Sequence, residues 1–154
     1  MQKTLVLIKP GAIQRELIGE VLKRFENKGF RICGLKMIHL TEDILRVHYA
    51  HLVERPFFAR ILRSMMATPV IALCLEGVEA VKVVRDMIGV TNGREAQAGT
   101  IRGDFSLSNQ ENMIHASDSV ENAAIEIKRF FLDNEIFSYT KVNQNYINYS
   151  DELI

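Results

Sequence analysis

The chain has 154 residues, 47% of them hydrophobic and 25% charged, and its 19 basic and 19 acidic side chains cancel to a formal net charge of zero. This composition is typical of a single globular domain, 1–154, with a core that needs no disulfide, and it excludes disorder and an overall basic surface that could hold nucleic acid. The cysteines form no CxxC pair, no apolar run could span a bilayer and no export signal is visible, so we predict a cytoplasmic protein.

Two short apolar runs predict strands that are buried on both faces, at residues 5–8 and 70–75. Between them, residues 30–40 alternate apolar and polar side chains, and the alternation changes phase at Gly34. This pattern predicts a more exposed strand with a bulge. A further short strand is predicted at residues 113–115.

Apolar residues at helical spacing predict five helices. The first covers residues 13–25 and stops at Gly29, the second covers 42–52, the third opens at Pro56, and the fourth covers 78–88 and ends at Gly89. The fifth follows a capping-box spacing at residues 118–121, and its inward-facing residues are predicted to be Val120, Ala123, Ala124, Ile127 and Phe131. Residues 90–112 are predicted to form a long loop, and from about 141 the chain is a polar tail.

The order of these elements is typical of an α/β (α+β) protein with a ferredoxin-like, split βαβ fold. Its four-stranded antiparallel sheet is covered by helices, and its first and third strands lie in the middle. A loop of about 20 residues in such a domain indicates either a functional segment or a wrong assignment.

Common glycine-rich phosphate sites are absent, because the chain has neither GxxxxGK[ST] nor GxGxxG, and kinase HRD and DFG motifs are missing too. Any nucleotide chemistry must therefore use side chains. Arg85 follows Val81 by four residues and precedes Ile88 by three, so we place it on the apolar stripe of its helix. A guanidinium there needs either an acidic partner or an anionic ligand. Lys9, at the end of an apolar strand, is either solvated or faces the same ligand.

Arg102 lies in the long loop between Gly99 and Gly103, which we interpret as flexible joints around a side chain that is solvated or grips phosphate. His48 and His51 have a spacing that could suit a metal, but without a further ligand we favour a solvated helix face and predict no metal site. His115 ends the short strand after the loop. It is either a core histidine or a reactive one.

Four stretches resemble, in order, the signature segments of the nucleoside diphosphate kinase family. They are KP at residues 9–10, RPFF at 55–58, GTIRGD at 99–104 and NMIHASD at 112–118, the last similar to the family's N-x-x-H-G-S-D motif. The resemblance is collinear over residues 4–139. It implies a ferredoxin-like fold and transfer of the γ-phosphate of ATP or another nucleoside triphosphate to a nucleoside diphosphate.

The resemblance also implies roles for residues at matching positions. His115 would be the nucleophile of a ping-pong reaction and would carry a phosphohistidine. Phe57 would stack on the base, and Tyr49 and Glu126 would support the histidine. The residues implied to hold phosphates and ribose are Lys9, Arg85, Thr91, Arg102 and Asn112.

The resemblance further implies that Mg²⁺ arrives bound to the nucleotide phosphates. It also implies a homo-oligomer, with a hexamer favoured over a tetramer because of the tail, where Tyr139, Tyr146 and Tyr149 would suit subunit contacts. The alternative is a non-catalytic nucleotide- or nucleic-acid-binding module on the same fold, which the lack of an RNP-like aromatic motif argues against.

Four positions depart from the family pattern. Gly11 and Ala12 stand where the family usually has Asp-Gly, in the segment where a helix starts. Gly93 replaces a frequent loop proline and predicts a looser loop. Ala116 follows the histidine where glycine is usual, and it would be strained if that position required a positive φ.

Overall fold

A computed structural model describes residues 1–153. In this part of the chain the strands and α-helices are β1 (Gln2–Ile8), α1 (Pro10–Gln14), α2 (Ile18–Lys28), β2 (Arg31–Ile38), α3 (Glu42–His48), α4 (Phe58–Met65), β3 (Val70–Gly77), α5 (Ala80–Ile88), α6 (Ile101–Phe105), β4 (Ile114–Ala116) and α7 (Val120–Phe130). Short 3-10 turns lie at Ala50–Leu52, Asp133–Glu135, Gln144–Tyr146 and Ser150–Glu152. No helix within residues 1–153 is long and apolar enough to cross a membrane.

The strands form one antiparallel sheet in the order β2-β3-β1-β4. This order confirms the predicted ferredoxin-like α+β fold, with the first and third strands in the centre. The predicted bulge in β2 is confirmed as well, because the β2–β3 register shifts between Ile32 and Gly34. The extra residue of the bulge is Cys33.

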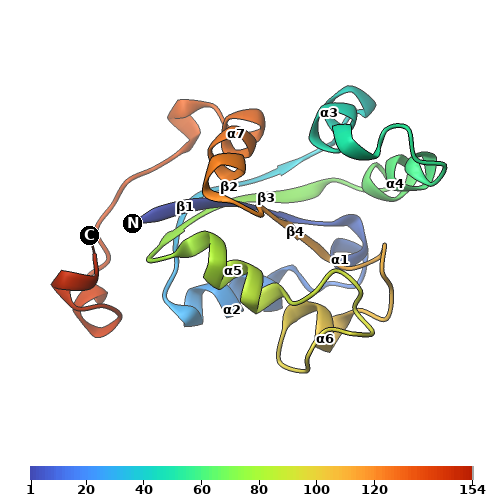
Figure 1. Cartoon of the computed structure of the whole chain (residues 1–154). Helices are drawn as coiled ribbons and strands as arrows, with labels where there is room; N and C mark the ends of the chain where they lie inside the picture. Colours follow the sequence, from blue (N-terminus) through green and yellow to red (C-terminus); the bar gives the residue numbers. More distant parts are fainter. Residues whose placement is uncertain (154) are drawn as a thin grey trace.

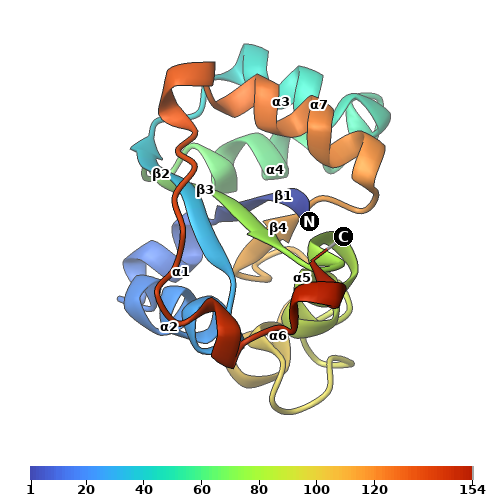
Figure 2. The same ribbon diagram turned by 90° about the vertical axis from the view of Figure 1, so that its left-hand side faces the viewer.

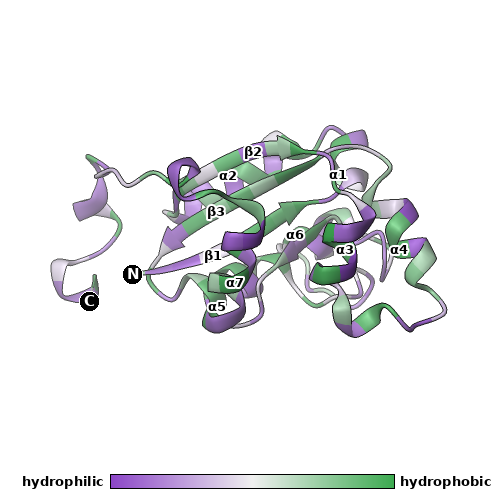
Figure 3. Ribbon diagram, turned by 90° about the horizontal axis from the view of Figure 1, so that it is seen from above, coloured by the Kyte–Doolittle hydropathy of each residue, from purple (hydrophilic) through white to green (hydrophobic). Residues whose placement is uncertain are grey.

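The sheet lies between two layers of helices (Figure 1), with α3, α4 and α7 on one face and α1, α2, α5 and α6 on the other. Alternate residues of β1 supply both cores, since successive side chains of a strand point to opposite faces. Leu5 and Leu7 pack toward α3, α4 and α7, and Val6 and Ile8 pack toward the other layer. Figure 3 shows the central strands as hydrophobic along most of their length and polar at the end near the N-terminus.

The single helix predicted over residues 13–25 is wrong, because two helices, α1 and α2, replace it. After α1 the chain enters the left-handed region at Glu16, whose φ is 59°. The Glu16 amide donates to Ile13 O and the Leu17 amide donates to Ala12 O. These are the two bonds of a Schellman motif, which ends a helix even when its left-handed residue is not glycine.

Three other helix boundaries differ from the prediction. The second helix ends at His48 and continues only as a 3-10 turn, and α4 begins at Phe58 rather than at Pro56. The cap of α7 is Ser119, whose Oγ accepts from the Asn122 amide at 3.1 Å. This start leaves two of the residues predicted to face inward, Val120 and Ala124, exposed.

The long loop is shorter than predicted because it contains α6, whose cap Thr100 accepts from the Gly103 amide at 3.0 Å. Gly103 is no flexible joint, since a Cβ there would lie 1.9 Å from Gln97 O. Gly93 does not loosen the loop either, because a Cβ there would lie 2.4 Å from Ser106 O. Both glycines permit close approach of backbone segments.

The strand before α7 starts one residue later than predicted, at Ile114. The residue with a positive φ in this region is Met113, at 72°, and not Ala116. The methyl group of Ala116 therefore adds no backbone strain beside His115. Gly11 lies inside α1, because the helix is capped at Lys9.

The segment that follows α7 runs past the edge strand β2 from the α7 layer toward the opposite layer (Figure 2) and leads into the polar tail. Lys141 Nζ holds it there by donating to Gly29 O at 3.2 Å and Phe30 O at 3.3 Å. Beyond this anchor, the side chains of Tyr146 and Tyr149 are exposed.

Candidate functional site

The register of β4 decides which way His115 points. His115 lies opposite Leu7 of β1, and Leu7 packs against the α3, α4 and α7 layer. Directly opposed residues of neighbouring strands share a face of the sheet. Ile114 and Ala116 pack into the opposite core. His115 is therefore presented to the side chains of α3 and α7.

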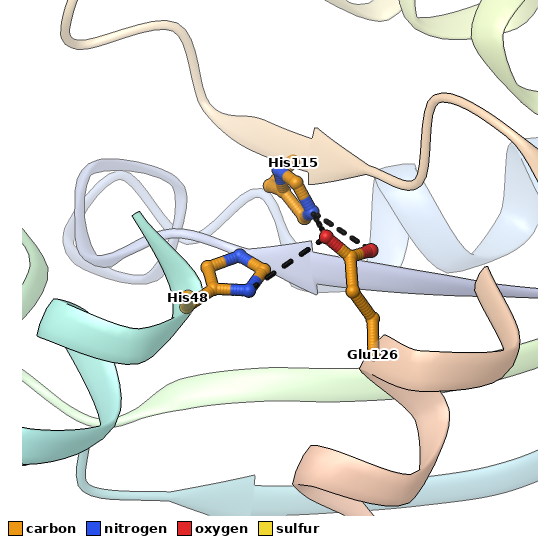
Figure 4. Close-up of side chains that lie close together, drawn as sticks. All are labelled: His48, His115 and Glu126. Carbon is orange, nitrogen blue, oxygen red and sulfur yellow. Dashed lines mark hydrogen bonds and ion pairs between the residues drawn. The ribbon is translucent and has the colours of Figure 1, made fainter. Parts of the chain in front are cut away.

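Glu126 of α7 meets His115 there (Figure 4), with both carboxylate oxygens 3.3 Å from His115 Nε2. Ser117 Oγ also donates to Glu126 Oε2, at 2.5 Å. Burial alone would raise the pKa of Glu126, but the hydrogen bonds from His115 and Ser117 outweigh it and lower the pKa to about 2.

The ionised Glu126 carboxylate can only accept hydrogen bonds, so His115 Nε2 must carry a hydrogen, and in the neutral form of the ring this fixes the tautomer. The lone pair then lies on His115 Nδ1, which has no hydrogen-bond partner among residues 1–153. The side chain of His115 is 21% exposed, so this nitrogen can meet a ligand. An oriented imidazole with a free nitrogen is the arrangement of a nucleophile.

His48 lies beside this pair, and its predicted position on a solvated helix face is wrong. Its side chain is 1% exposed and packs against the rings of His115, Tyr49 and Phe130, with centroid distances of 4.5, 4.7 and 5.1 Å. Burial, reinforced by His115, lowers the pKa of His48 to about 3. A signal was present in the sequence, because His48 follows the buried Leu45 by three residues and shares its helix face.

His48, His115 and Glu126 each offer an atom within 4.8 Å of the others, a spacing that a metal ion could use. However, Arg129 Nη1 already lies 3.0 Å from His48 Nδ1, the nitrogen that faces Glu126. Nδ1 of His48 is therefore already occupied by a guanidinium donor. Tyr49 contributes ring packing, with its centroid 6.2 Å from that of His115.

A cleft of about 1000 Å³ opens in front of His115. It is bounded by the α3–α4 segment on one side and by the segments around α6 and before β4 on the other. All the site residues predicted from the sequence line it together, namely Lys9, Tyr49, Phe57, Arg85, Thr91, Arg102, Asn112, His115 and Glu126.

Lys9 and Asn112 are joined at the base of the cleft, where Lys9 Nζ donates to Asn112 Oδ1 at 2.7 Å. Burial and the nearby Arg102 lower the pKa of Lys9 to about 8, against an opposing effect of Glu111. The Asn112 amide group donates to Thr91 O and to Asn109 O. Asn112 therefore holds the loop in place and also lines the cleft.

The flanking glycines led us to predict a mobile Arg102 side chain that is solvated or grips phosphate, but in the structure this side chain is held in place. It is 6% exposed and donates to Gly89 O and Ile114 O at 2.8 Å and to Asn112 O at 3.3 Å. Burial and Arg85 lower the pKa of Arg102 to about 10. Its guanidinium thus ties the end of α5, β4 and the preceding loop together.

Arg85 is exposed, so its predicted place on the buried stripe of α5 is wrong. The stripe consists of Val81, Val84 and Ile88, and Arg85 lies at its edge with access to the cleft. No acidic side chain within residues 1–153 forms an ion pair with Arg85. Of the two alternatives, the acidic partner is thus missing, which favours an anionic ligand. Phe57, at 39% exposure, also has a free ring face.

Three further arginines line the cleft and were missed, Arg60 on α4, Arg94 after α5 and Arg129 on α7. Arg94 Nη1 donates to Leu107 O at 3.1 Å. Single arginines on a helix and in a loop carry no pattern that separates them from ordinary surface charge. Ser117 was missed as well, although it lies inside the NMIHASD stretch.

Comparison with known proteins gives a consistent result. The family model described as nucleoside diphosphate kinase matches residues 2–136. The chain is 57% identical over 153 residues to a nucleoside diphosphate kinase of Parabacteroides distasonis, covering 99% of this chain and 100% of that relative. It is 47% identical over 146 residues to nucleoside diphosphate kinase A of Homo sapiens, covering 95% and 96%. A solved nucleoside diphosphate kinase from Halobacterium salinarum in complex with CDP superimposes with a TM-score of 0.93 at 33% identity, covering 96% and 99%.

Proposed function

We propose, from the premise that this chain belongs to the nucleoside diphosphate kinase family, that His115 carries the phosphate between its two substrates. The chain is an enzyme that transfers the terminal phosphate of a nucleoside triphosphate to a nucleoside diphosphate. Our proposal concerns the path that the phosphate takes between the two nucleotides and the residues that act along it. The observation that carries it is the contact of His115 Nε2 with both Glu126 oxygens, which leaves Nδ1 as the free nitrogen.

In the first half-reaction, the lone pair of His115 Nδ1 attacks the γ-phosphorus. The bond from this phosphorus to the bridging oxygen breaks, and the nucleoside diphosphate leaves with the electron pair. The phosphorylated imidazole then bears a positive charge, which the ionised Glu126 stabilises through Nε2–H. In the second half-reaction, a terminal oxygen of another nucleoside diphosphate attacks the same phosphorus, and the P–N bond breaks to restore neutral His115.

The cationic residues of the cleft would neutralise and position the phosphates, which is the main requirement of phosphoryl transfer. We assign direct phosphate contact to Lys9 and Arg85, whose charged groups line the cleft. Arg102 has two N–H groups left after its three backbone bonds, so it would contribute fewer contacts. Thr91 and Asn112 would hold the nearby phosphates or ribose.

Phe57 would stack on the base at the entrance of the cleft. A flat ring reads no base edge, so we expect broad base tolerance. We further propose that Mg²⁺ enters as part of the nucleotide substrate, where it would neutralise phosphate charge. The carboxylate closest to His115, that of Glu126, is already engaged by two hydrogen bond donors and is not available to it.

We propose a homo-oligomer, with a hexamer as the favoured form. β2 is an edge strand of the sheet, and it exposes large apolar side chains at Leu35 and Met37, with Phe137 also exposed. Such a surface is unusual for a strand that stays unpaired. Light scattering would determine the mass of the assembly in solution.

The cytoplasmic location also stays a prediction, supported by the free, buried Cys33 and Cys74.

The test of the route is to incubate the chain with Mg²⁺ and γ-labelled ATP in the absence of an acceptor. We expect label on the protein that is lost in acid, survives base and moves to GTP when GDP is added. His115→Ala should abolish the labelling and keep nucleotide binding. Ping-pong turnover retained in folded His115→Ala would show that another residue carries the phosphate.

A further inference from the structure

His48 and Arg129 form a contact that the route described above does not use. Arg129 of α7 places Nη1 3.0 Å from Nδ1 of His48 of α3. A guanidinium only donates hydrogen bonds and stays protonated, so His48 Nδ1 must accept. His48 is therefore neutral and carries its hydrogen on Nε2, an atom that is buried and has no partner within residues 1–153.

The tautomer of His48 matters because His48 and His115 face the same carboxylate oxygen. Glu126 Oε1 lies 3.3 Å from His115 Nε2 and 3.7 Å from His48 Nδ1. If His48 Nδ1 carried a hydrogen, His48 would become a second ring donor to this oxygen. The carboxylate would then be drawn toward α3, and the hydrogen bond that orients His115 would weaken.

We propose that Arg129 is a positioning residue for His115: by donating to His48 Nδ1, it sets the tautomer of His48 and leaves Glu126 to His115. The proposal rests on the proposed role of His115 as the phosphate carrier. The other titratable or charged groups around His48 are Lys9, Tyr49 and His115, and within residues 1–153 none of them forms a hydrogen bond with either ring nitrogen of His48. His48 cannot easily turn away, because three aromatic rings pack against it.

The tautomer can be measured directly by nitrogen-15 NMR of the full chain with labelled histidine, with His48→Gln used to assign the signals. We expect the Nε2–H form of His48 in the parent chain. Arg129→Leu should convert a large part of His48 to the Nδ1–H form. Lys128→Leu is the matched control, because it removes a positive charge from the neighbouring exposed position of α7 and should leave the tautomer unchanged.

The rate of His115 phosphorylation by ATP gives a second readout. Arg129→Leu should slow it about tenfold, the effect of one oriented hydrogen bond, and Lys128→Leu should not. In a His48→Phe background, Arg129→Leu should cost nothing further, since phenylalanine has no donor that could compete for Glu126. Thermal unfolding would confirm that each variant is folded.

An unchanged His48 tautomer in Arg129→Leu would overturn the proposal, whatever the rate. An equal rate loss in the His48→Phe background would overturn it too, because Arg129 would then act by another path. Failure of the parent chain to be labelled on His115 would instead refute the proposed route, and the NMR result would still report separately on Arg129 and His48.

Discussion

Arg102 and Arg85 had equal standing as candidate phosphate-binding residues, yet the structure gives them different surroundings and therefore separable effects. Consider Arg102→Met, which keeps most of the side-chain volume and removes every donor. Three backbone carbonyls, those of Gly89, Asn112 and Ile114, would lose a charged hydrogen-bond donor. Each loss costs about 1–3 kcal/mol when the carbonyl stays buried. Removal of a desolvated charge returns part of this cost.

We expect a net loss of about 3 kcal/mol in the free energy of unfolding of Arg102→Met. For a domain of about 150 residues, 1 kcal/mol shifts the melting temperature by about 2–4 °C, so the expected decrease is about 6–12 °C. The assay is thermal unfolding followed by circular dichroism at matched protein concentrations, since assembly itself changes the apparent stability.

Arg85→Met is the matched control, because Arg85 is exposed and has no ion-pair partner among residues 1–153. It should melt within about 2 °C of the parent chain, since exposed substitutions change stability by about 0.5 kcal/mol or less. It should nevertheless lower kcat/KM by about 10²–10³, the range seen when one transition-state donor is lost. Arg102→Met melting at the parent temperature would refute the structural role of the guanidinium. An Arg85→Met variant with normal turnover would refute the catalytic assignment.

Three further predictions each concern one residue. Gly103→Ala should lose roughly 1–3 kcal/mol or more in the free energy of unfolding, and so melt at a lower temperature, because its Cβ would lie 1.9 Å from Gln97 O. A melting temperature equal to that of the parent chain would contradict this close approach. The pKa of Lys9 in the folded protein is about 8, against an ordinary value of 10.5. In the enzyme without nucleotide, Lys9 therefore loses its positive charge as the pH rises through about 8. KM for the nucleotide should therefore rise above about pH 8, and Lys9→Met should abolish this dependence. Glu126 has a folded pKa of about 2 against an ordinary 4.5, so its stabilising effect is complete above about pH 4.5 and is lost as pH falls toward 2. Urea unfolding should show the stability gap between the parent and Glu126→Gln narrowing over that range, and a gap independent of pH would show that Glu126 is not the group that titrates.

The sequence alone determined the frame of this protein. The two apolar runs became the central strands β1 and β3, because a strand buried on both faces needs apolar side chains in both directions. The phase change at Gly34 became the bulge of β2, and Gly89 ended α5. The predicted site residues also meet in one cleft, although they come from segments far apart in the chain. Before the structure, only the resemblance to a family predicted that these residues would form one site.

Other features depended on contacts that no local pattern contains. The split of the predicted first helix at Glu16 is an exception, because its bonds from the Glu16 and Leu17 amides are local, but glutamate does not mark a left-handed position in a sequence as glycine does. Arg102 became a structural cross-link, because folding brings three carbonyls that lie 10 to 13 residues away in the chain around its guanidinium. His48 changed from a predicted surface residue to a buried one, because α7 packs over its helix face.

The difference between the features that the sequence predicts and those that only the tertiary structure shows has a physical basis. Burial patterns, caps and bulges depend on neighbours within a few residues, so the sequence specifies them directly. Hydrogen-bond partners and tautomers depend on which groups folding places within about 3 Å of one another. The Arg129–His48 contact joins residues 81 positions apart, and the His115–Glu126 contact requires the register of β4 against β1. Only the tertiary structure could decide which nitrogen of each ring holds the hydrogen.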